Sequence, residues 1–254
     1  LVFGTLKVIG IDLRGAAVDA SAQVIVAARD NKVTEGVYRL TTGPLGPLAS
    51  TPTVKLAKRN HPQLVLIHGT FVDTASTFGK WWDNHPGVIR RLFSAYQDEV
   101  YALDHATLGA SPIANALTLA RALPDNARLH LVTHSRGGLV AEALVRACAG
   151  ITPADLAFFE PEDGRDYTHH VAELKALGDA LRGRNIHVDR VVRVACPAHG
   201  THLASGRLDA YFSVLTFLLE KTLGPLGDDV GQFLNDVART RMSPSQVPGL
   251  EAML

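Results

Sequence analysis

Short, mostly apolar runs of four or five residues alternate with longer amphipathic stretches through the middle of the chain. Runs of this kind are typical of strands that are buried on both faces of a sheet. The stretches between them are long enough to form helices that cover such a sheet. A repeated strand–helix–strand order predicts a mostly parallel sheet flanked by helices, which is an α/β fold. The predicted strands are 64–67, 100–103, 129–132 and 191–195, and the predicted helices are 88–96, 113–123, 138–149 and 168–182.

The two ends of the chain follow other patterns. Residues 1–48 contain three short β-rich runs separated by turns, which predict an N-terminal β region that could form an edge of the same sheet. Residues 43–53 are rich in Pro and Gly and are expected to form a loop. Two helices are predicted at 207–222 and 228–241, and no strand is predicted after residue 205.

These patterns predict one α/β domain over residues 49–254, with an insertion between strands at 150–187. Right-handed crossovers place the carboxyl ends of parallel strands at one edge of the sheet. Ligands bind at that edge in open α/β sheets, so we expect functional residues just after the strands.

The composition limits the possible functions. The 254 residues include 25 Lys and Arg against 25 Asp and Glu, and 46% are hydrophobic, which is typical of a globular protein. The balanced charge argues against a general nucleic-acid-binding protein. Two cysteines cannot form a disulfide framework, so a cytoplasmic location is expected. The longest uncharged apolar run, residues 210–219, is half the length of a membrane span, so no span is expected.

A serine stands at the junction between a predicted strand and a predicted helix. Residues 131–140 read Leu-Val-Thr-His-Ser-Arg-Gly-Gly-Leu-Val, so an apolar strand runs into Ser135 and two glycines open the helix. This order is similar to the nucleophile elbow G-x-S-x-G, in which a strained turn raises a serine hydroxyl above the sheet edge. The residues two before and two after the serine must be small. Gly137 meets this requirement, whereas Thr133 departs from it, and Ser135 is the candidate nucleophile.

A second predicted strand ends in His68, Gly69 and Thr70, about 65 residues before the serine. An acyl-transfer enzyme needs backbone N–H donors for the oxyanion of its tetrahedral intermediate. One donor is expected from the residue after the nucleophile, Arg136. The other is expected from the loop after the earlier strand, at Thr70 or, less favourably, Phe71. Gly69 allows the backbone to come close, and His68 is expected to shape this loop through its ring nitrogens.

Together the two motifs resemble the α/β-hydrolase family, in its lipase and esterase branch. Residues 101–105 and the loop 107–112 are similar to the family's next strand, which ends in an acidic residue, and its Gly- and Ser-containing loop. Residues 194–201 resemble the Thr-Pro-His-x-Gly segment of many lipases. The resemblance covers residues 62–210 and implies an α/β-hydrolase-like fold and a serine hydrolase that acts on a carboxylic ester. It also implies that the insertion at 150–187 is cap-like and that the C-terminal strands of the domain over 49–254 are missing. The chain is also similar to lipase-like domains of large multidomain bacterial proteins.

The acid and the base of such a hydrolase follow the serine in the order Asp or Glu and then His. The base is expected after the last strand, but no histidine follows His202 and no later strand is predicted. We therefore expect the acid and the base beyond residue 254, in a longer chain with other domains. His199, which follows a predicted strand at the same edge as Ser135, is the base candidate within the chain.

Three functions stay open at this point. A hydrolase would cleave a small-molecule or lipid ester through an acyl-enzyme on Ser135. A non-catalytic hydrolase-like module would retain the serine only as part of the fold and would bind a ligand or another protein. A serine acyltransferase shares every motif found. The histidine pairs 199/202 and 169/170 lack the ligand patterns of known metal sites, so neither a metal nor a cofactor is expected.

Overall fold

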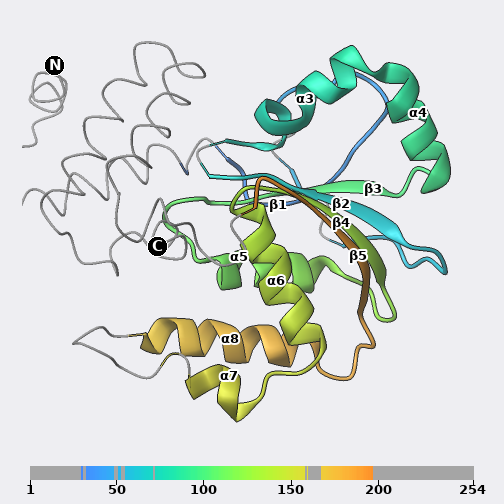
Figure 1. The fold of residues 1–254 in the computed structure, drawn as a ribbon. Helices are drawn as coiled ribbons and strands as arrows, with labels where there is room; N and C mark the ends of the chain where they lie inside the picture. The colour runs from blue at the N-terminus through green and yellow to red at the C-terminus, as the bar shows by residue number, and fades with distance from the viewer. Residues whose placement is uncertain are drawn as a thin grey trace, which may run out of the picture.

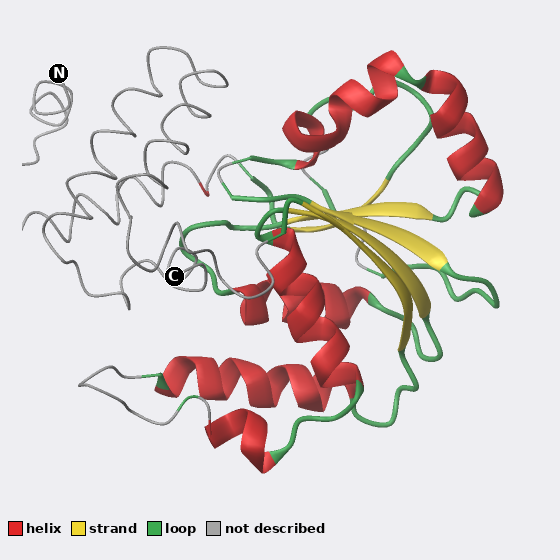
Figure 2. Cartoon of the chain, in the orientation of Figure 1, coloured by secondary structure: helices red, strands yellow, loops and turns green. Residues whose placement is uncertain are grey.

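A mixed sheet of five strands forms the centre of the fold, and helices cover both of its faces (Figure 1). The computed structural model describes residues 30, 33–48, 51–52, 55–70, 72–157, 159 and 167–196, and Figure 2 distinguishes its helices, strands and loops. In chain order the elements are β1 (Gly36–Arg39), β2 (Gln63–Ile67), α3 (Thr74–Asn84), α4 (Pro86–Ala95), β3 (Val100–Asp104), α5 (Pro112–Ala122), β4 (Arg128–His134), α6 (Gly137–Cys148), α7 (Pro153–Ala157), α8 (Thr168–Leu181) and β5 (His187–Val194).

The strand order across the sheet is β1-β3-β2-β4-β5. The edge strand β1 is antiparallel to β3, whereas β3, β2, β4 and β5 are all parallel to one another. The carboxyl ends of these four strands therefore meet at one edge of the sheet. The predicted α/β class and the mostly parallel sheet are confirmed.

Alternate side chains of the inner strands enter two separate hydrophobic cores. In β2, Val65 and Ile67 belong to the core on one face, whereas Leu64 and Leu66 belong to the core on the other. Every residue of β2 and β3 is buried. Because neither face of these strands meets water, their sequences show continuous apolar runs instead of apolar–polar alternation.

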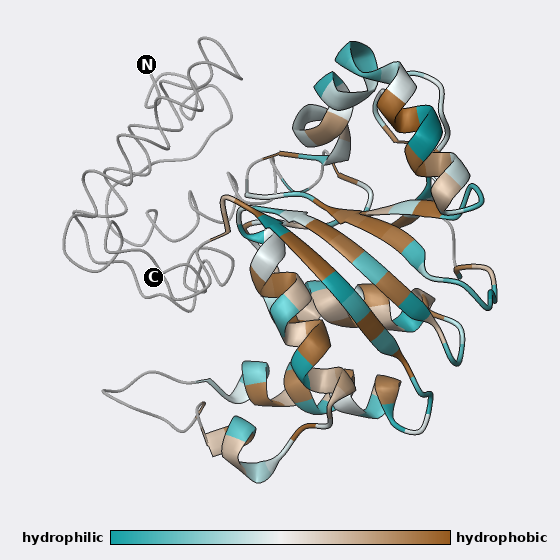
Figure 3. Cartoon of the chain, turned by 45° about the vertical axis from the view of Figure 1, so that its right-hand side comes forward, coloured by the Kyte–Doolittle hydropathy of each residue, from teal (hydrophilic) through white to brown (hydrophobic). Residues whose placement is uncertain are grey.

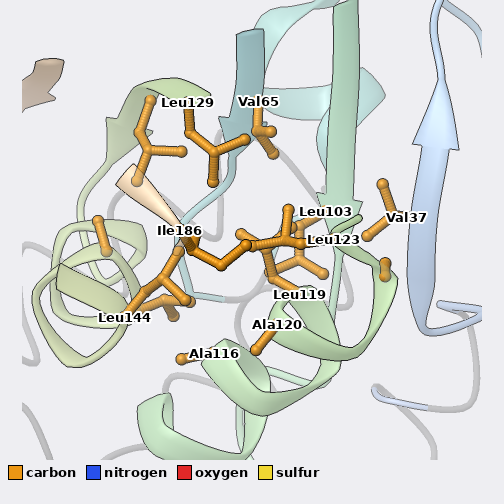
Figure 4. Close-up of a cluster of buried hydrophobic side chains, with 14 of the residues drawn as sticks. Val37, Val65, Leu103, Ala116, Leu119, Ala120, Leu123, Leu129, Leu144 and Ile186 are labelled. Atoms are coloured by element: carbon orange, nitrogen blue, oxygen red, sulfur yellow. The ribbon is translucent and has the colours of Figure 1, made fainter. Parts of the chain in front are cut away.

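The larger core lies between the sheet and helices α5 and α6 (Figure 4), and α8 packs against these two helices and extends the helical layer. Leu119 of α5, Leu144 of α6 and Leu177 of α8 are each 0% exposed. Burial of one such side chain contributes roughly 1.5–3 kcal/mol to folding. The segment 150–187 thus supplies α8 to this layer, and the interpretation of the whole segment as a cap stays a prediction.

Helices α3 and α4 cover the opposite face. Phe78 and Trp82 of α3 pack with Ile89 and Phe93 of α4 against the sheet. The rings of Trp82 and Phe93 meet edge to face, with their centroids 6.2 Å apart, and the indole N–H of Trp82 donates to the carbonyl of Thr41 (2.9 Å). The sequence did not predict α3, because its few buried residues stand in an otherwise polar segment.

The sheet departs from expectation at β5, which begins at His187 rather than at the predicted residue 191. This last strand of the described sheet exposes most of its side chains, including those of Val192 and Val194 (Figure 3). Its first half contains a single valine among polar residues, and for this reason the apolar pattern predicted only the second half. Strand β1 matches the third β-rich run of the N-terminal region. The first two runs and the helices predicted after residue 205 lie outside the described residues. Within the described part, no helix combines the length and the apolar character that a membrane crossing requires.

A buried carboxylate ties three segments together at the amino edge of the sheet. Glu99, just before β3, accepts hydrogen bonds from Arg39 (3.0 Å), Arg59 (2.9 Å), Tyr101 (2.5 Å) and Gln63 (3.3 Å). Burial by itself would raise the pKa of Glu99. The hydrogen bonds from Tyr101 and Arg59 and the charges of the two arginines outweigh it, and the pKa is lowered. Glu99 therefore stays ionised and holds β1, β3 and the segment before β2 in place.

Replacing Glu99 by Gln should reduce the free energy of unfolding near pH 7 by about 1–3 kcal/mol, because the buried donors Tyr101 and Gln63 and the two arginines lose a charged acceptor. The carboxylate stabilises the fold fully above the unfolded-state pKa of 4.5, and this contribution is lost as the pH falls through the lower pKa of the folded state. Urea denaturation of both proteins at about pH 7 and about pH 3 measures the effect, and the difference between them should shrink at the lower pH.

Glu142→Gln is the matched control, because Glu142 also pairs with two arginines, Arg146 and Arg193, but on the exposed surface. We expect it to change the free energy of unfolding by less than about 1 kcal/mol. Equal losses in the two variants would show that burial of the Glu99 network adds nothing to stability.

Candidate functional site

Ser135 lies in the turn between β4 and α6, at the carboxyl edge of the sheet. Its backbone φ is +51°, in the left-handed region that non-glycine residues seldom occupy. The Ser135 N–H donates to the carbonyl of Val194 on β5 (2.9 Å), and the Ser135 carbonyl accepts from the N–H of Gly138 (3.0 Å). The neighbouring strand and the start of the helix thus hold the serine in a conformation that costs on the order of 1–3 kcal/mol.

Two glycines allow this turn to approach the end of β2. A Cβ on Gly69 would lie 2.8 Å from Cβ of Ser135, and a Cβ on Gly137 would lie 2.5 Å from the carbonyl oxygen of Ile67 and 2.7 Å from that of His68. Each of these distances is shorter than real Cβ contacts allow. The sequence motif is therefore explained by a backbone crossing that has no room for side chains at either position.

Thr133, which departs from the small residue expected two before the serine, faces away from this crossing. Its side chain is fully buried, and its hydroxyl donates to the carbonyl of Val192 (3.3 Å). The same hydroxyl lies 3.3 Å from Sγ of Cys196. Gly138 makes room for this arrangement, since a Cβ there would lie 2.6 Å from Cβ of Cys196. Thr133 is accommodated because Cys196 lies next to its hydroxyl. The space for Cys196 exists because Gly138 of α6 has no side chain.

His68 contacts the backbone at the ends of two strands. The backbone N–H of His105 donates to Nε2 of His68 (3.2 Å), so the proton of a neutral ring is on Nδ1, which lies 2.9 Å from the carbonyl oxygen of Gly69. The two imidazoles stack with their centroids 4.0 Å apart. Burial holds the pKa of His105 well below 6.5, so this ring is uncharged near neutral pH. His68 thereby joins the turn after β2 to the turn after β3.

Asp104, the last residue of β3, anchors the start of α3. Its buried carboxylate accepts from the backbone N–H of Thr74 (3.0 Å) and from the Thr74 hydroxyl. Burial raises the pKa of Asp104, and these two hydrogen bonds act in the opposite direction. The acidic residue that the sequence resemblance placed at the end of this strand therefore binds a helix N-terminus.

The side chain of Arg136 is completely buried beneath the turn, a feature that the sequence did not reveal. Its guanidinium donates to the carbonyl of Ala110, in the loop between β3 and α5. Burial lowers the pKa of Arg136 to about 10, while the negative charge of Asp30 acts to raise it. The sequence predicts a role only for the backbone N–H of Arg136, since no local pattern distinguishes this arginine from one on the surface.

The structure brings together most of the residues that the sequence singled out. Ser135, Gly137, Gly69 and His68 meet where β2 and β4 end, and Thr70 directly follows Gly69 in the same turn. The roles of Thr70 and Arg136 as oxyanion donors stay predictions. His199 lies outside the described residues.

The described part of the chain shows no histidine or carboxylate hydrogen-bonded to the Ser135 hydroxyl. The ring of the preceding residue, His134, lies against Gly69, with Nδ1 3.0 Å from the position that a Cβ would take. Burial lowers the pKa of His134. Within the same part of the chain, no group of three or more His, Cys, Asp or Glu side chains is arranged to hold a metal ion. The described part of the site consists of the left-handed Ser135 and of a close backbone contact at Gly69 and Gly137.

Gly137→Ala should lower the free energy of unfolding by about 2 kcal/mol, because the added methyl group overlaps two carbonyl oxygens of β2 and the turn must shift. Urea denaturation measures the loss. Gly46→Ala is the control, since nothing lies within 4 Å of a Cβ at that position. We expect the control to be neutral or slightly stabilising. If both variants unfold at the same urea concentration, the crossing at Gly137 is looser than the structure shows.

A family model described as "Domain of unknown function (DUF7379)" matches residues 43–158 of this chain. The matched range contains β2, β3, β4 and α6, and so includes both Gly69 and the turn with Ser135. No curated protein matches the chain, and neither does any solved structure.

Proposed function

We propose that this protein is a serine hydrolase of the α/β-hydrolase type that cleaves a carboxylic ester through an acyl-enzyme on Ser135. The observation that carries the proposal is the left-handed backbone of Ser135, φ +51°, between a parallel strand and a helix. Left-handed serines are uncommon, and backbone strain of this kind is concentrated at functional sites. A nucleophile elbow requires this geometry, because it places the hydroxyl beyond the edge of the sheet.

The chemistry follows from the position of the serine. Oγ of Ser135 attacks the ester carbonyl and transfers its proton to a general base, and the alcohol leaves with a proton returned from that base. The backbone N–H groups of Thr70 and Arg136 are the proposed donors to the oxyanion. Ser135 and Arg136 also precede the first turn of α6, where the helix dipole favours developing negative charge. Water then releases the acid from the acyl-enzyme.

The general base is not among the residues that the structure describes. His199 is the candidate base within the chain. The substrate class, an ester with an apolar acyl part, comes from the family resemblance. A reducing, cytoplasmic location fits the two free cysteines, Cys148 and Cys196.

Labelling with a fluorophosphonate probe tests the nucleophile directly. The parent chain should be labelled, and Ser135→Ala should lose the label. If the chain hydrolyses p-nitrophenyl butyrate, the same substitution should reduce kcat by about 10³-fold or more. Ser94→Ala, on the exposed surface of α4, is the control and should retain both signals.

The other two functions give different results in this experiment. An acyltransferase would also be labelled at Ser135, but would release product only when an alcohol acceptor is added. A non-catalytic module would show no label that depends on Ser135. Equal labelling of the parent and Ser135→Ala would contradict the proposed nucleophile.

A further inference from the structure

The loop after β3 binds a carboxylate that comes from a distant part of the chain. Oδ1 of Asp30 accepts from the backbone N–H groups of Thr107 (3.0 Å) and Leu108 (3.4 Å), and Oδ2 accepts from that of Gly109 (2.7 Å). Asp30 and Thr107 are 77 residues apart in the sequence. Successive backbone N–H groups that converge in this way form an anion-binding nest. Both carboxylate oxygens are used, so the nest fits the width of a carboxylate.

A buried positive charge reinforces this nest. The guanidinium of Arg136 donates to Ala110, the residue that follows Gly109 in the loop. The charge of Asp30 raises the pKa of Arg136 against the effect of burial, which shows that the two charges attract each other. Charges interact strongly here because the guanidinium is 0% exposed and is poorly screened by water.

One end of the nest is open to solvent. Thr107 and Leu108 are buried, whereas Gly109 is exposed. The hydrogen bond from Gly109 to Asp30 is likewise exposed. A small anion in solution can therefore reach the position of the Asp30 carboxylate from the side of Gly109.

The nest is also connected to the candidate nucleophile. His105, two residues before Thr107, stacks on His68 and donates its N–H to that ring. The next residue along from His68, Gly69, packs against Ser135. Two successive contacts therefore join the loop to the turn with Ser135.

We propose that the N–H groups of Thr107, Leu108 and Gly109, backed by Arg136, form a carboxylate-binding site. Asp30 is its internal ligand, and a free carboxylate compound takes the same position when Asp30 is displaced. The chain thus carries its own competitor for the site. This inference concerns binding and holds whether or not Ser135 is a nucleophile.

Acetate binding to the Asp30→Ala variant of the full chain tests the proposal. Amide chemical shifts of residues 107–109 in ¹⁵N-labelled protein should move saturably as sodium acetate is added, with sodium chloride at equal ionic strength as the reference. In the parent, where Asp30 competes, the apparent affinity should be at least about tenfold lower, as expected when the competent state is a minor one. Asp83→Ala, which removes an exposed aspartate of α3, is the matched control and should behave like the parent.

A thermal measurement provides a second readout. Asp30→Ala should lower Tm by about 3 °C, and acetate but not chloride should restore most of this loss, because a ligand that binds the folded state stabilises it. Asp30→Asn, which removes the charge and keeps one side-chain oxygen, replaces the alanine variant if that variant does not fold.

Several results would overturn the proposal. If neither Asp30 variant shows a saturable response to acetate, the N–H groups of residues 107–109 do not bind a free carboxylate, and the hydrogen bonds of Asp30 only stabilise the fold. Equal acetate affinity in parent and variant would place binding elsewhere. Saturation by phosphate without saturation by acetate would exclude a carboxylate as the ligand class.

Discussion

The close contact between the end of β2 and the turn after β4 determines the geometry of the whole carboxyl edge. Two positions in this contact, Gly69 and Gly137, have no room for a Cβ. Because these two residues lack side chains, the start of α6 lies against the end of β2, next to the left-handed Ser135. The approach of the turn to the end of β2 therefore depends on a steric requirement that only glycine meets at these two positions.

Buried polar side chains near this contact each have a partner that stacks on them or forms hydrogen bonds with them. The neutral ring of His105 stacks on His68, and the carboxylate of Asp104 receives two donors from Thr74. Burial shifts the pKa of His105 and of Asp104 toward the uncharged form. The charge of Arg136, whose side chain is fully buried beside the serine, acts through a medium of low dielectric.

The sequence revealed the parts of the fold that are buried on both sides. β2 and β3 were predictable because every residue in them is buried and their apolar runs are continuous, whereas α3 and the first half of β5 were missed because they present polar residues to water. The same distinction holds at the site. Ser135 and the glycines around it form a local motif. The contact between Arg136 and Ala110 spans 26 residues and that between Asp30 and Thr107 spans 77, and no local pattern records such contacts.

The Glu99 network and the serine turn lie at opposite edges of the same sheet, separated by the five-residue strands β2 and β3, a length of roughly 16 Å. Charge pairing at the amino edge secures the strands, while the loops at the carboxyl edge present the candidate chemistry. Substitutions in the exposed part of the carboxyl-edge loops therefore leave the ionic attachment of the strands at the amino edge unchanged. A directed-evolution library confined to residues 105–111 would vary the loop after β3 on a scaffold whose buried network around Glu99 it leaves untouched.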